Sequence, residues 1–419
     1  MLEAANSRNR LSLLVIGPRI SRVSIGEAYS AYKRIEALSE LADLTLFTSH
    51  CDRNPVKEKD FPFAKKVVSW KEPSASSILG RLDERVKPTW PFFYYKVRQW
   101  LKDQRKRGVT FHIAHQITPQ GARYPTPLRG LGFPYVIGPV GGGLPPPPPL
   151  AGEISPLSLT RIAPIVDAFR SRFDPLLRKS FEEAAIVFGV APYVADILAP
   201  FKVRDFRVLS ERCNPNSKKP LPPKLSSQRM EGPITILHVG RVIRTKGLLD
   251  TIRAIALLKE YRNIHLISAG DGPNLEQCRK EAGRLGVADR VDFLGRIERS
   301  EVEELYRRAD IFCFPSFREP MGGVLFEAMS WSLPIITTSY GGPDFILDDS
   351  SAIKIEPDEP MRFASKIAEA LRRLITDVHL RMELGSCARA RLASLETWRE
   401  NAEWILTCYK EVLSKTVED

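Results

Sequence analysis

Short apolar runs alternate with segments of helical periodicity along most of this chain. In the first half, this pattern predicts strands at residues 11–17, 44–48, 111–115, 135–138 and 186–189, and helices at residues 26–41 and 175–185. In the second half, it predicts strands at residues 234–239, 264–269, 291–294, 311–314 and 335–338, and helices at residues 248–259, 274–285, 301–309 and 324–330. Strands that alternate with helices form parallel sheets covered on both faces, so we expect an α/β protein.

Two tracts of loop composition interrupt this alternation. Residues 138–149 join a glycine-rich stretch to five consecutive prolines, and residues 214–232 have almost no apolar content. We therefore expect two Rossmann-like domains facing a central cleft, with ligands at the carboxyl ends of the strands. The domains span residues 1–213 and 233–396, joined by a linker at 214–232. The sequence leaves open which domain the amphipathic helix at residues 397–419 packs on, a return to the N-terminal domain being one alternative.

Composition narrows the class of protein. Hydrophobic residues make up 43% of the 419 residues and charged residues 27%, which excludes a disordered, fibrous or polytopic membrane protein. No apolar run is long enough to span a bilayer, no signal peptide is recognisable, and the six cysteines are scattered, so we expect a cytoplasmic protein without a disulfide framework or zinc site. The 62 Lys+Arg against 50 Asp+Glu give a net charge of +12, which favours an anionic partner such as nucleic acid, acidic lipid or a phosphorylated small molecule.

Phosphate-binding residue types follow the predicted strands of the second half. Gly240 and Arg241 come directly after one strand, and Lys246 and Gly247 open the next helix. An arginine fork, a lysine charge and a helix N-terminus together suit a diphosphate, although a solvated basic turn is the alternative. After the next strand, the turn at residues 270–273 resembles half of a dinucleotide fingerprint but lacks its third glycine, so a structural turn is favoured over an NAD site. The backbone after Gly295 could contact a base, or could simply end a strand.

The segment from residue 314 to residue 329 contains two glutamates that flank a pair of glycines. Glu319 lies in the loop after a strand, and Glu327 lies one turn into the next helix. Gly322 and Gly323 leave bare N–H groups where that helix begins, and such groups favour an anion. A carboxylate can accept two hydrogen bonds from neighbouring sugar hydroxyls. The alternatives are a helix-surface charge for Glu327 and a capping contact for Glu319.

Taken together and in this order, these motifs resemble the retaining family-4 glycosyltransferases over about 110 residues. The resemblance implies a GT-B fold whose N-terminal domain faces the acceptor and whose C-terminal domain binds a nucleotide-sugar. It implies that Arg241 and Lys246 neutralise the donor diphosphate, that Glu319 contacts the transferred sugar, and that Glu327 binds the ribose. The implied donor-binding residues are Gly26, Gly240, Arg241, Lys246, Gly295, Arg296, Ile297, Glu319, Met321, Gly322, Gly323, Val324 and Glu327, and the implied catalytic residues are Glu319, His115, Arg241 and Lys246.

The implied reaction is the transfer of a hexose, with retention, from a UDP-, GDP- or ADP-sugar to a saccharide or lipid-linked acceptor. Because the chain contains no D-x-D motif, we expect no metal and no other cofactor, with basic side chains in the metal's place. We expect same-face attack, in which the departing phosphate takes the acceptor's proton. The alternative function is a GT-B-like nucleotide-sugar epimerase, and no nucleic-acid-binding module is recognisable.

Three features of the first half remain open. Gly26 matches a loop that lies over the donor phosphates in the family, and His115 matches a histidine near the donor sugar, although a lone histidine is also a common structural residue. Residues 87–107 place aromatic residues before basic ones, which suits an anionic membrane surface at the inner face of the membrane. A helix packed in the core with a solvated basic end is the alternative.

Overall fold

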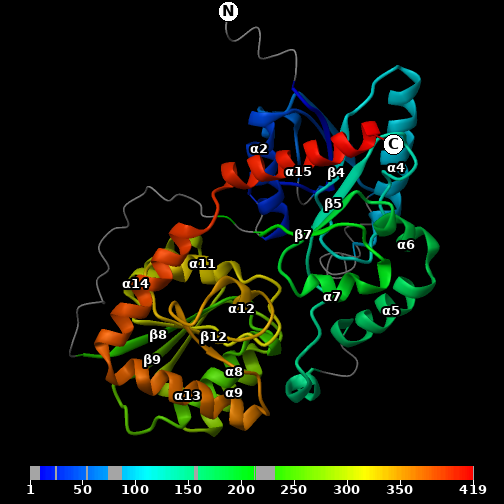
Figure 1. The fold of residues 1–419 in the computed structure, drawn as a ribbon. Coiled ribbons are helices and arrows are strands. Elements are labelled where there is room, and N and C mark those ends of the chain that lie inside the picture. The colour runs from blue at the N-terminus through cyan, green and yellow to red at the C-terminus, as the bar shows by residue number, and fades with distance from the viewer. Residues whose placement is uncertain are drawn as a thin grey trace, which may run out of the picture. The chain divides into compact units, whose positions relative to one another are not determined.

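The computed structural model describes residues 10–23, 26–52, 55–73, 87–154, 159–211, 213 and 232–418, with the side chains of residues 159–165, 417 and 418 excepted. The chain divides into two compact units (Figure 1). Unit 1 comprises Met1–Gly143, Ile165–Pro215 and Glu396–Asp419, and unit 2 comprises Leu144–Pro164 and Asn216–Leu395. The proposed linker at residues 214–232 lies outside the described residues except for Gly232.

Unit 1 is built on a seven-stranded parallel sheet in the order β3-β2-β1-β4-β5-β6-β7. The strands are β1 (Ser12–Pro18), β2 (Asp43–His50), β3 (Lys66–Lys71), β4 (Ile113–Gln116), β5 (Tyr135–Val140), β6 (Ile186–Gly189) and β7 (Phe206–Val208). The helices are α2 (Glu27–Leu41), α4 (Trp90–Lys106), α5 (Leu159–Phe173), α6 (Pro175–Glu182), α7 (Val194–Leu198) and α15 (Trp398–Glu418), with 3-10 turns at Glu58–Asp60 and Ala199–Phe201. The boundary between the units falls within α5, which joins unit 1 from Ile165 onward. The four apolar residues Leu13–Ile16 of β1 are fully buried, as a central parallel strand requires.

Unit 2 contains a six-stranded parallel sheet in the order β10-β9-β8-β11-β12-β13. The strands are β8 (Ile234–Val239), β9 (Ile264–Ala269), β10 (Val291–Gly295), β11 (Ile311–Cys313), β12 (Ile335–Thr338) and β13 (Ala352–Ile355). The helices are α8 (Leu248–Ala256), α9 (Leu275–Arg284), α10 (Arg299–Arg308), α11 (Gly323–Ser330), α12 (Gly342–Ile346), α13 (Pro360–Thr376) and α14 (Val378–Ser394), with 3-10 turns at Pro148–Glu153, Arg244–Lys246 and Ala288–Arg290. The strand order reverses between β8 and β11, and ligands of open parallel sheets bind at such a point.

The α/β class and the two parallel sheets predicted from the sequence are confirmed. The alternation pattern missed the edge strands β3, β7 and β13, which are short or only half-buried and therefore lack a continuous apolar run. Among the described residues, no helix is both long enough and apolar enough to cross a bilayer.

The C-terminal helix α15 belongs to unit 1 and contributes to its core. The guanidinium group of Arg34 in α2 is fully buried, donates to Asn401 Oδ1 over 3.1 Å and lies 5.5 Å from the Trp398 ring. Residues 144–164 depart from the expected division, because they group with unit 2 although they precede the proposed linker. In this segment Leu150 is buried in the core of unit 2, and Glu153 forms an ion pair with Arg244, described below.

Candidate functional site

Backbone hydrogen bonds join the loops that follow β8, β9 and β10 into one continuous edge. The N–H of Gly240 donates to the carbonyl of Ala269 over 3.0 Å, and that of Val242 donates to the carbonyl of Asp271 over 3.0 Å. The N–H of Gly270 donates to the carbonyl of Gly295 over 2.8 Å. Three motifs that are far apart in the sequence thus meet at the carboxyl edge of the sheet, as strand geometry predicts.

The turn at residues 270–273 is explained by backbone packing. Gly270 has a φ of +146°, and a Cβ added there would lie 1.8 Å from the carbonyl oxygen of Gly240. A Cβ at Gly272 would lie 2.3 Å from the carbonyl oxygen of Val242. These glycines allow two loops to touch, which favours the structural turn over a dinucleotide fingerprint.

The loop that carries Lys246 is held against the loop that follows β11. Gly247 has a φ of +79°, and a Cβ there would lie 2.3 Å from the carbonyl oxygen of Pro315. The Ser316 hydroxyl donates to the carbonyl of Thr245 over 3.0 Å. Underneath, the imidazole Nε2 of His238 lies 3.1 Å from the carbonyl of Lys246, and burial lowers the pKa of His238 to about 4, so its neutral ring is the donor.

Lys246 and Glu319 form an ion pair between their Nζ and Oε2 atoms. The two side chains are only 16% and 12% exposed, and the Lys246 ammonium lies 5.7 Å from the centre of the Phe314 ring. The structure therefore brings together the predicted diphosphate lysine and the predicted sugar carboxylate. Arg241 is exposed near the beginning of the same loop.

The loop that carries Glu319 runs directly into α11. Gly322 is the N-terminal cap of α11 with a φ of +91°, and Gly323 is the first helical residue. The carbonyl of Glu319 accepts from the N–H of Gly342 over 2.9 Å. This backbone contact fixes Glu319 beside the N-terminal end of a helix, where partial positive charge collects. Met321 is buried, and Val324 is half-buried in the first turn of α11.

Glu327 lies in the second turn of α11 and pairs with an arginine that the sequence analysis did not single out. Its Oε1 accepts from Nη1 of Arg299, the first residue of α10, over 2.7 Å. The Glu327 side chain is 24% exposed. Close by along the chain, Gly295 has a φ of +67°, Arg296 is exposed and Ile297 is half-buried.

Arg244 is a second residue that the sequence analysis missed. Its side chain is 8% exposed, donates to Asp250 over 2.5 and 2.9 Å and to Glu153 Oε2 over 2.7 Å, and lies 5.2 Å from the Phe317 ring. Arg244 therefore stabilises the loop between Arg241 and Lys246, and it attaches residues 148–153 to unit 2. No local signal distinguishes it from Arg241, because only the fold places Asp250 and Glu153 beside it.

His115 and Gly26 lie in unit 1. His115 is fully buried in β4, and burial lowers its pKa to about 3. Its Nε2 lies 2.6 Å from the carbonyl of Gly138, and its Nδ1 lies 2.6 Å from the Tyr409 hydroxyl of α15, so both ring nitrogens are hydrogen-bonded. This geometry favours the structural alternative for His115. Gly26 caps α2 with a φ of +65°, and a Cβ added there would meet no described atom within 4 Å.

A family model matches most of the second unit. Residues 224–391 match the family model described as "Glycosyl transferases group 1". The matched range includes the motifs around Lys246, Gly295, Glu319 and Glu327. This part of the chain is similar to the group 1 glycosyltransferases.

Two curated relatives match over a similar length. One is an undecaprenol-linked glycan alpha-1,4-N-acetyl-D-galactosaminyltransferase of Campylobacter jejuni, which is 30% identical over 174 residues, 41% of this chain and 46% of the relative. The other is the D-inositol 3-phosphate glycosyltransferase of Corynebacterium jeikeium, which is 33% identical over 183 residues, 42% of each protein. The match therefore spans less than half the length of these curated relatives.

Solved structures resemble the whole chain. The sucrose-phosphate synthase of Thermosynechococcus elongatus superposes with a TM-score of 0.68 at 19% identity, covering 97% of this chain and 100% of that one. Anabaena HepE in complex with UDP and glucose superposes with a TM-score of 0.62 at 16% identity, covering 96% and 99%. At such low identity the likeness shows the fold, which is GT-B.

Proposed function

We propose that this chain is a retaining glycosyltransferase that moves a hexose from a nucleotide-diphosphate sugar to a saccharide or lipid-linked acceptor. The observation that carries the proposal is the pair of Lys246 and Glu319 beside the N-terminal end of α11. It lies within residues 224–391, the segment that matches the family model of the group 1 glycosyltransferases. UDP is the first donor nucleotide to test, because a structural neighbour binds it.

The chemistry proposed for Arg241 and Lys246 follows from the leaving group. When a nucleoside diphosphate departs from a sugar, negative charge grows on the phosphate and positive charge grows on the anomeric carbon. Fixed cationic side chains and helix N–H groups stabilise the growing phosphate charge, and removing one such donor typically slows turnover about 10²–10³-fold. We propose that the side chains of Arg241 and Lys246 take the place of a metal ion. The independence of the reaction from metal stays a prediction.

The two glutamates are assigned different parts of the donor. Glu319, which lies beside Lys246, would accept hydrogen bonds from the hydroxyls of the transferred sugar. Glu327, held at one oxygen by Arg299, would offer its other oxygen to the ribose. The acceptor would then attack the same face of the sugar that the phosphate leaves, and the phosphate would take the proton.

Calorimetric titration with UDP, GDP, ADP and NAD tests the donor site. We expect one nucleoside diphosphate to bind, and Lys246→Ala to weaken that binding at least about tenfold. Lys259→Ala is the matched control, because Lys259 is exposed in the turn that follows α8. Binding of NAD alone would overturn the proposal, and the comparisons above give no support to the epimerase alternative.

The retention of configuration needs a separate measurement. Once a donor is found, the anomeric configuration of the product can be compared with that of the donor by NMR. The same configuration is expected, and an inverted product would contradict the retaining mechanism while leaving transferase activity in place. Cytoplasmic location and contact with a membrane stay predictions at this point.

A further inference from the structure

Helix α5 turns its aromatic side chains toward solvent. Phe169 is 64% exposed, Phe173 is 61% exposed and Val166 is 49% exposed. Residues spaced three and four apart lie on one side of a helix, so these side chains form one apolar stripe. The two phenylalanine rings lie 4.8 Å apart and pack against each other rather than against the core.

The opposite side of α5 attaches to unit 1 through polar groups. Arg123 Nη2 donates to Asp167 Oδ2 over 2.7 Å, and Arg170 Nη1 donates to the carbonyl of Arg123 over 2.9 Å. Asp167 is half-buried, and burial raises the pKa of its carboxyl group. A surface helix normally buries its apolar side and exposes its polar side, and α5 does the reverse over residues 166–173.

The exposed charge beside this stripe is entirely basic. Between residues 166 and 182, where every side chain is described, the exposed charged residues are Arg172 and Lys179. The acidic residues of the same stretch are half-buried, and each pairs with an arginine in Arg123–Asp167, Arg170–Asp174 and Arg178–Glu182. The Arg172 guanidinium lies 5.9 Å from the Phe173 ring, so apolar and cationic groups share one surface.

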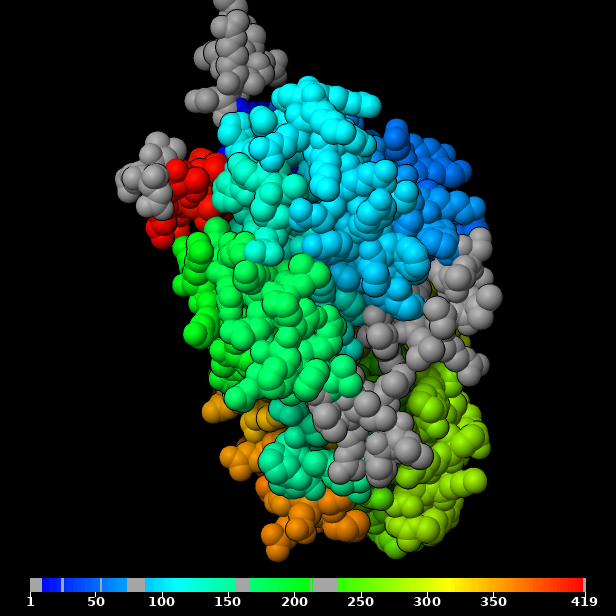
Figure 2. Space-filling model, turned by 90° about the vertical axis from the view of Figure 1, so that its right-hand side faces the viewer, coloured from blue at the N-terminus to red at the C-terminus, as the bar shows by residue number. Residues whose placement is uncertain are grey.

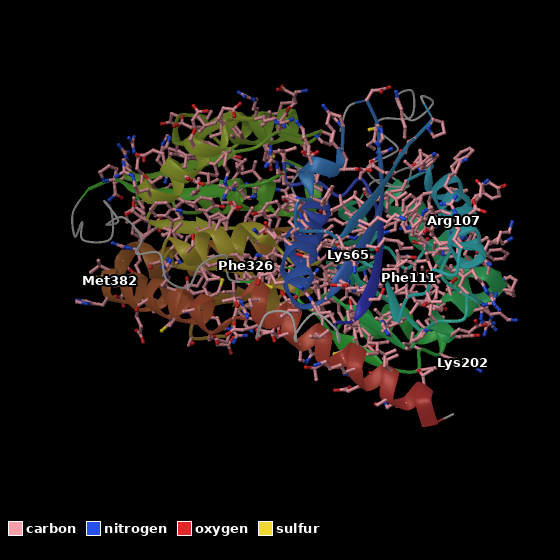
Figure 3. The ribbon with its side chains drawn as sticks, turned by 90° about the horizontal axis from the view of Figure 1, so that it is seen from above. Lys65, Arg107, Phe111, Lys202, Phe326 and Met382 are labelled. Carbon is pink, nitrogen blue, oxygen red and sulfur yellow. The ribbon has the colours of Figure 1, made fainter. Side chains whose placement is uncertain are left out.

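Helix α4 also exposes aromatic and basic side chains. Phe93, Val97 and Leu101 are buried, whereas Phe92 and Tyr95 are 56% and 64% exposed on the other side of the helix. Its C-terminal end exposes the basic residues Lys102, Arg105, Lys106 and Arg107. Figure 2 looks onto the side of the molecule where α4, α5 and α6 lie in Figure 1, and α4 and the α5–α6 region appear on the same face. Arg107 lies at the outer edge of unit 1 in Figure 3.

We propose that the α5 face, formed by Val166, Phe169, Arg172, Phe173 and Lys179, docks on the surface of an anionic lipid bilayer. The phenylalanine rings would enter the boundary between headgroups and acyl chains, and the two cations would meet lipid phosphates. The basic end of α4 would add long-range attraction. An uncharged or basic partner would leave both cations uncompensated, which is why an anionic surface fits this face. The proposal stands on unit 1 alone and does not depend on the donor site.

Co-sedimentation of the full chain with vesicles tests this docking. The wild-type protein should sediment with phosphatidylcholine vesicles that contain phosphatidylglycerol, and much less with phosphatidylcholine alone. The double variant Phe169→Ser, Phe173→Ser should bind at least about tenfold more weakly, because two large apolar side chains no longer leave water. The double variant Arg172→Glu, Lys179→Glu should lose the preference for phosphatidylglycerol and its sensitivity to salt.

The matched control is Met361→Ser, Met382→Ser. These methionines are 60% and 49% exposed on unit 2, and Met382 lies at its outer edge (Figure 3). The control should bind vesicles like the wild type, and the circular dichroism of every variant should match the wild type. Equal loss in the control and the α5 variants would overturn the proposal, as would absence of wild-type binding.

A second copy of this chain is the competing occupant, and sedimentation velocity distinguishes it. If the wild type dimerises without lipid and Phe169→Ser, Phe173→Ser makes it monomeric, the α5 face is a dimer interface and the bilayer proposal is wrong. Nucleotide titration of the same variant separates this result from the proposed function. Vesicle binding lost with nucleotide binding intact supports docking, whatever the donor site proves to be.

Discussion

Lys246 and Glu319 are 73 residues apart in the sequence and form a half-buried ion pair beside the N-terminal end of α11. One belongs to the loop after β8 and the other to the loop after β11, and these neighbouring strands mark the reversal of strand order in unit 2. The Lys246 ammonium group is therefore paired with the Glu319 carboxylate. An arriving diphosphate would compete for, or share, the same ammonium group.

Glu319→Gln should separate sugar binding from nucleotide binding. The substitution keeps the shape of the side chain but removes the charge that Lys246 faces, so nucleoside diphosphate affinity should stay equal or rise. Turnover should fall about 10²–10³-fold if the carboxylate stabilises the reacting sugar. Calorimetry and initial rates measure the two effects. A parallel fall in nucleotide affinity would assign Glu319 to the phosphate rather than the sugar.

Arg299 should act on the nucleotide only through Glu327. Glu327→Ala should weaken binding of the nucleoside diphosphate about tenfold or more, because a charged hydrogen bond is lost. Arg299→Ala should weaken this binding less. In a chain that already carries Glu327→Ala, adding Arg299→Ala should not change nucleotide affinity further. A 2′-deoxy nucleotide should show neither effect if the contact is to that ribose hydroxyl.

The control for the Arg299 and Glu327 variants is Arg308→Ala, which removes an exposed arginine of α10 paired with Glu304. It should leave nucleotide affinity unchanged. An effect of Arg299→Ala that persists without Glu327 would mean that Arg299 contacts the nucleotide directly.

Arg244→Met should destabilise unit 2 by about 3–5 kcal/mol, because it leaves the fully buried Asp250 without its main cationic partner. Urea unfolding combined with hydrogen exchange over α8 measures the loss. Arg308→Met, which removes a largely exposed ion pair, should change stability by less than about 1 kcal/mol. Similar costs for both variants would contradict the role given to Arg244.

Gly270→Ala should disrupt the edge of the sheet, because its Cβ would overlap the Gly240 carbonyl and its φ of +146° is rarely adopted by other residues. We expect a cost of at least about 1–3 kcal/mol in unfolding free energy and weaker nucleotide binding. Gly283→Ala, at an exposed position of α9 with open space around it, should instead stabilise by up to about 1 kcal/mol. Equal effects would show that the loop contact is unimportant.

Stability should fall as the pH drops below about 6.5. Burial lowers the pKa of His115 to about 3 and of His238 to about 4, so the unfolded chain takes up protons that the folded chain excludes. Between about pH 6.5 and its pKa in the folded chain, each histidine lowers the free energy of unfolding by about 1.4 kcal/mol for each unit that the pH falls. Comparing urea unfolding at pH 7 and pH 5, His115→Gln and His238→Gln should each show a shallower dependence than the wild type. An unchanged dependence would mean that the imidazoles are accessible to protons.

The order of strands and helices could be predicted from the sequence because central parallel strands are buried on both faces and leave continuous apolar runs. The run at residues 234–239 matches β8 at both ends. The donor-site motifs could be placed for a related reason, since residues that follow parallel strands meet at one edge. Both inferences need only the local period of apolar residues and the geometry of a sheet.

Partners that are distant in the sequence could not be predicted. Arg299 beside Glu327, Glu153 and Asp250 around Arg244, and Tyr409 against His115 each depend on how separate elements pack. His115 is an example. Its position at the end of a predicted strand suited a catalytic role, but Tyr409 of α15, 294 residues away in the sequence, packs against its ring in the folded chain. The segment at residues 87–107 is a second example. Phe93 is buried there, whereas Phe92 and Tyr95 are exposed, and the order of residues in the sequence did not distinguish them.

The sequence by itself determined the two α/β units and the set of residues at the carboxyl edge of the second sheet, because both follow from short-range periodicity. The tertiary structure alone decided which charges pair, which histidines lose contact with water, and which side of α5 faces outward. These properties arise from burial and from contacts between distant segments. Which side of a helix is buried depends on the segments that pack against it, and these are set by the tertiary structure.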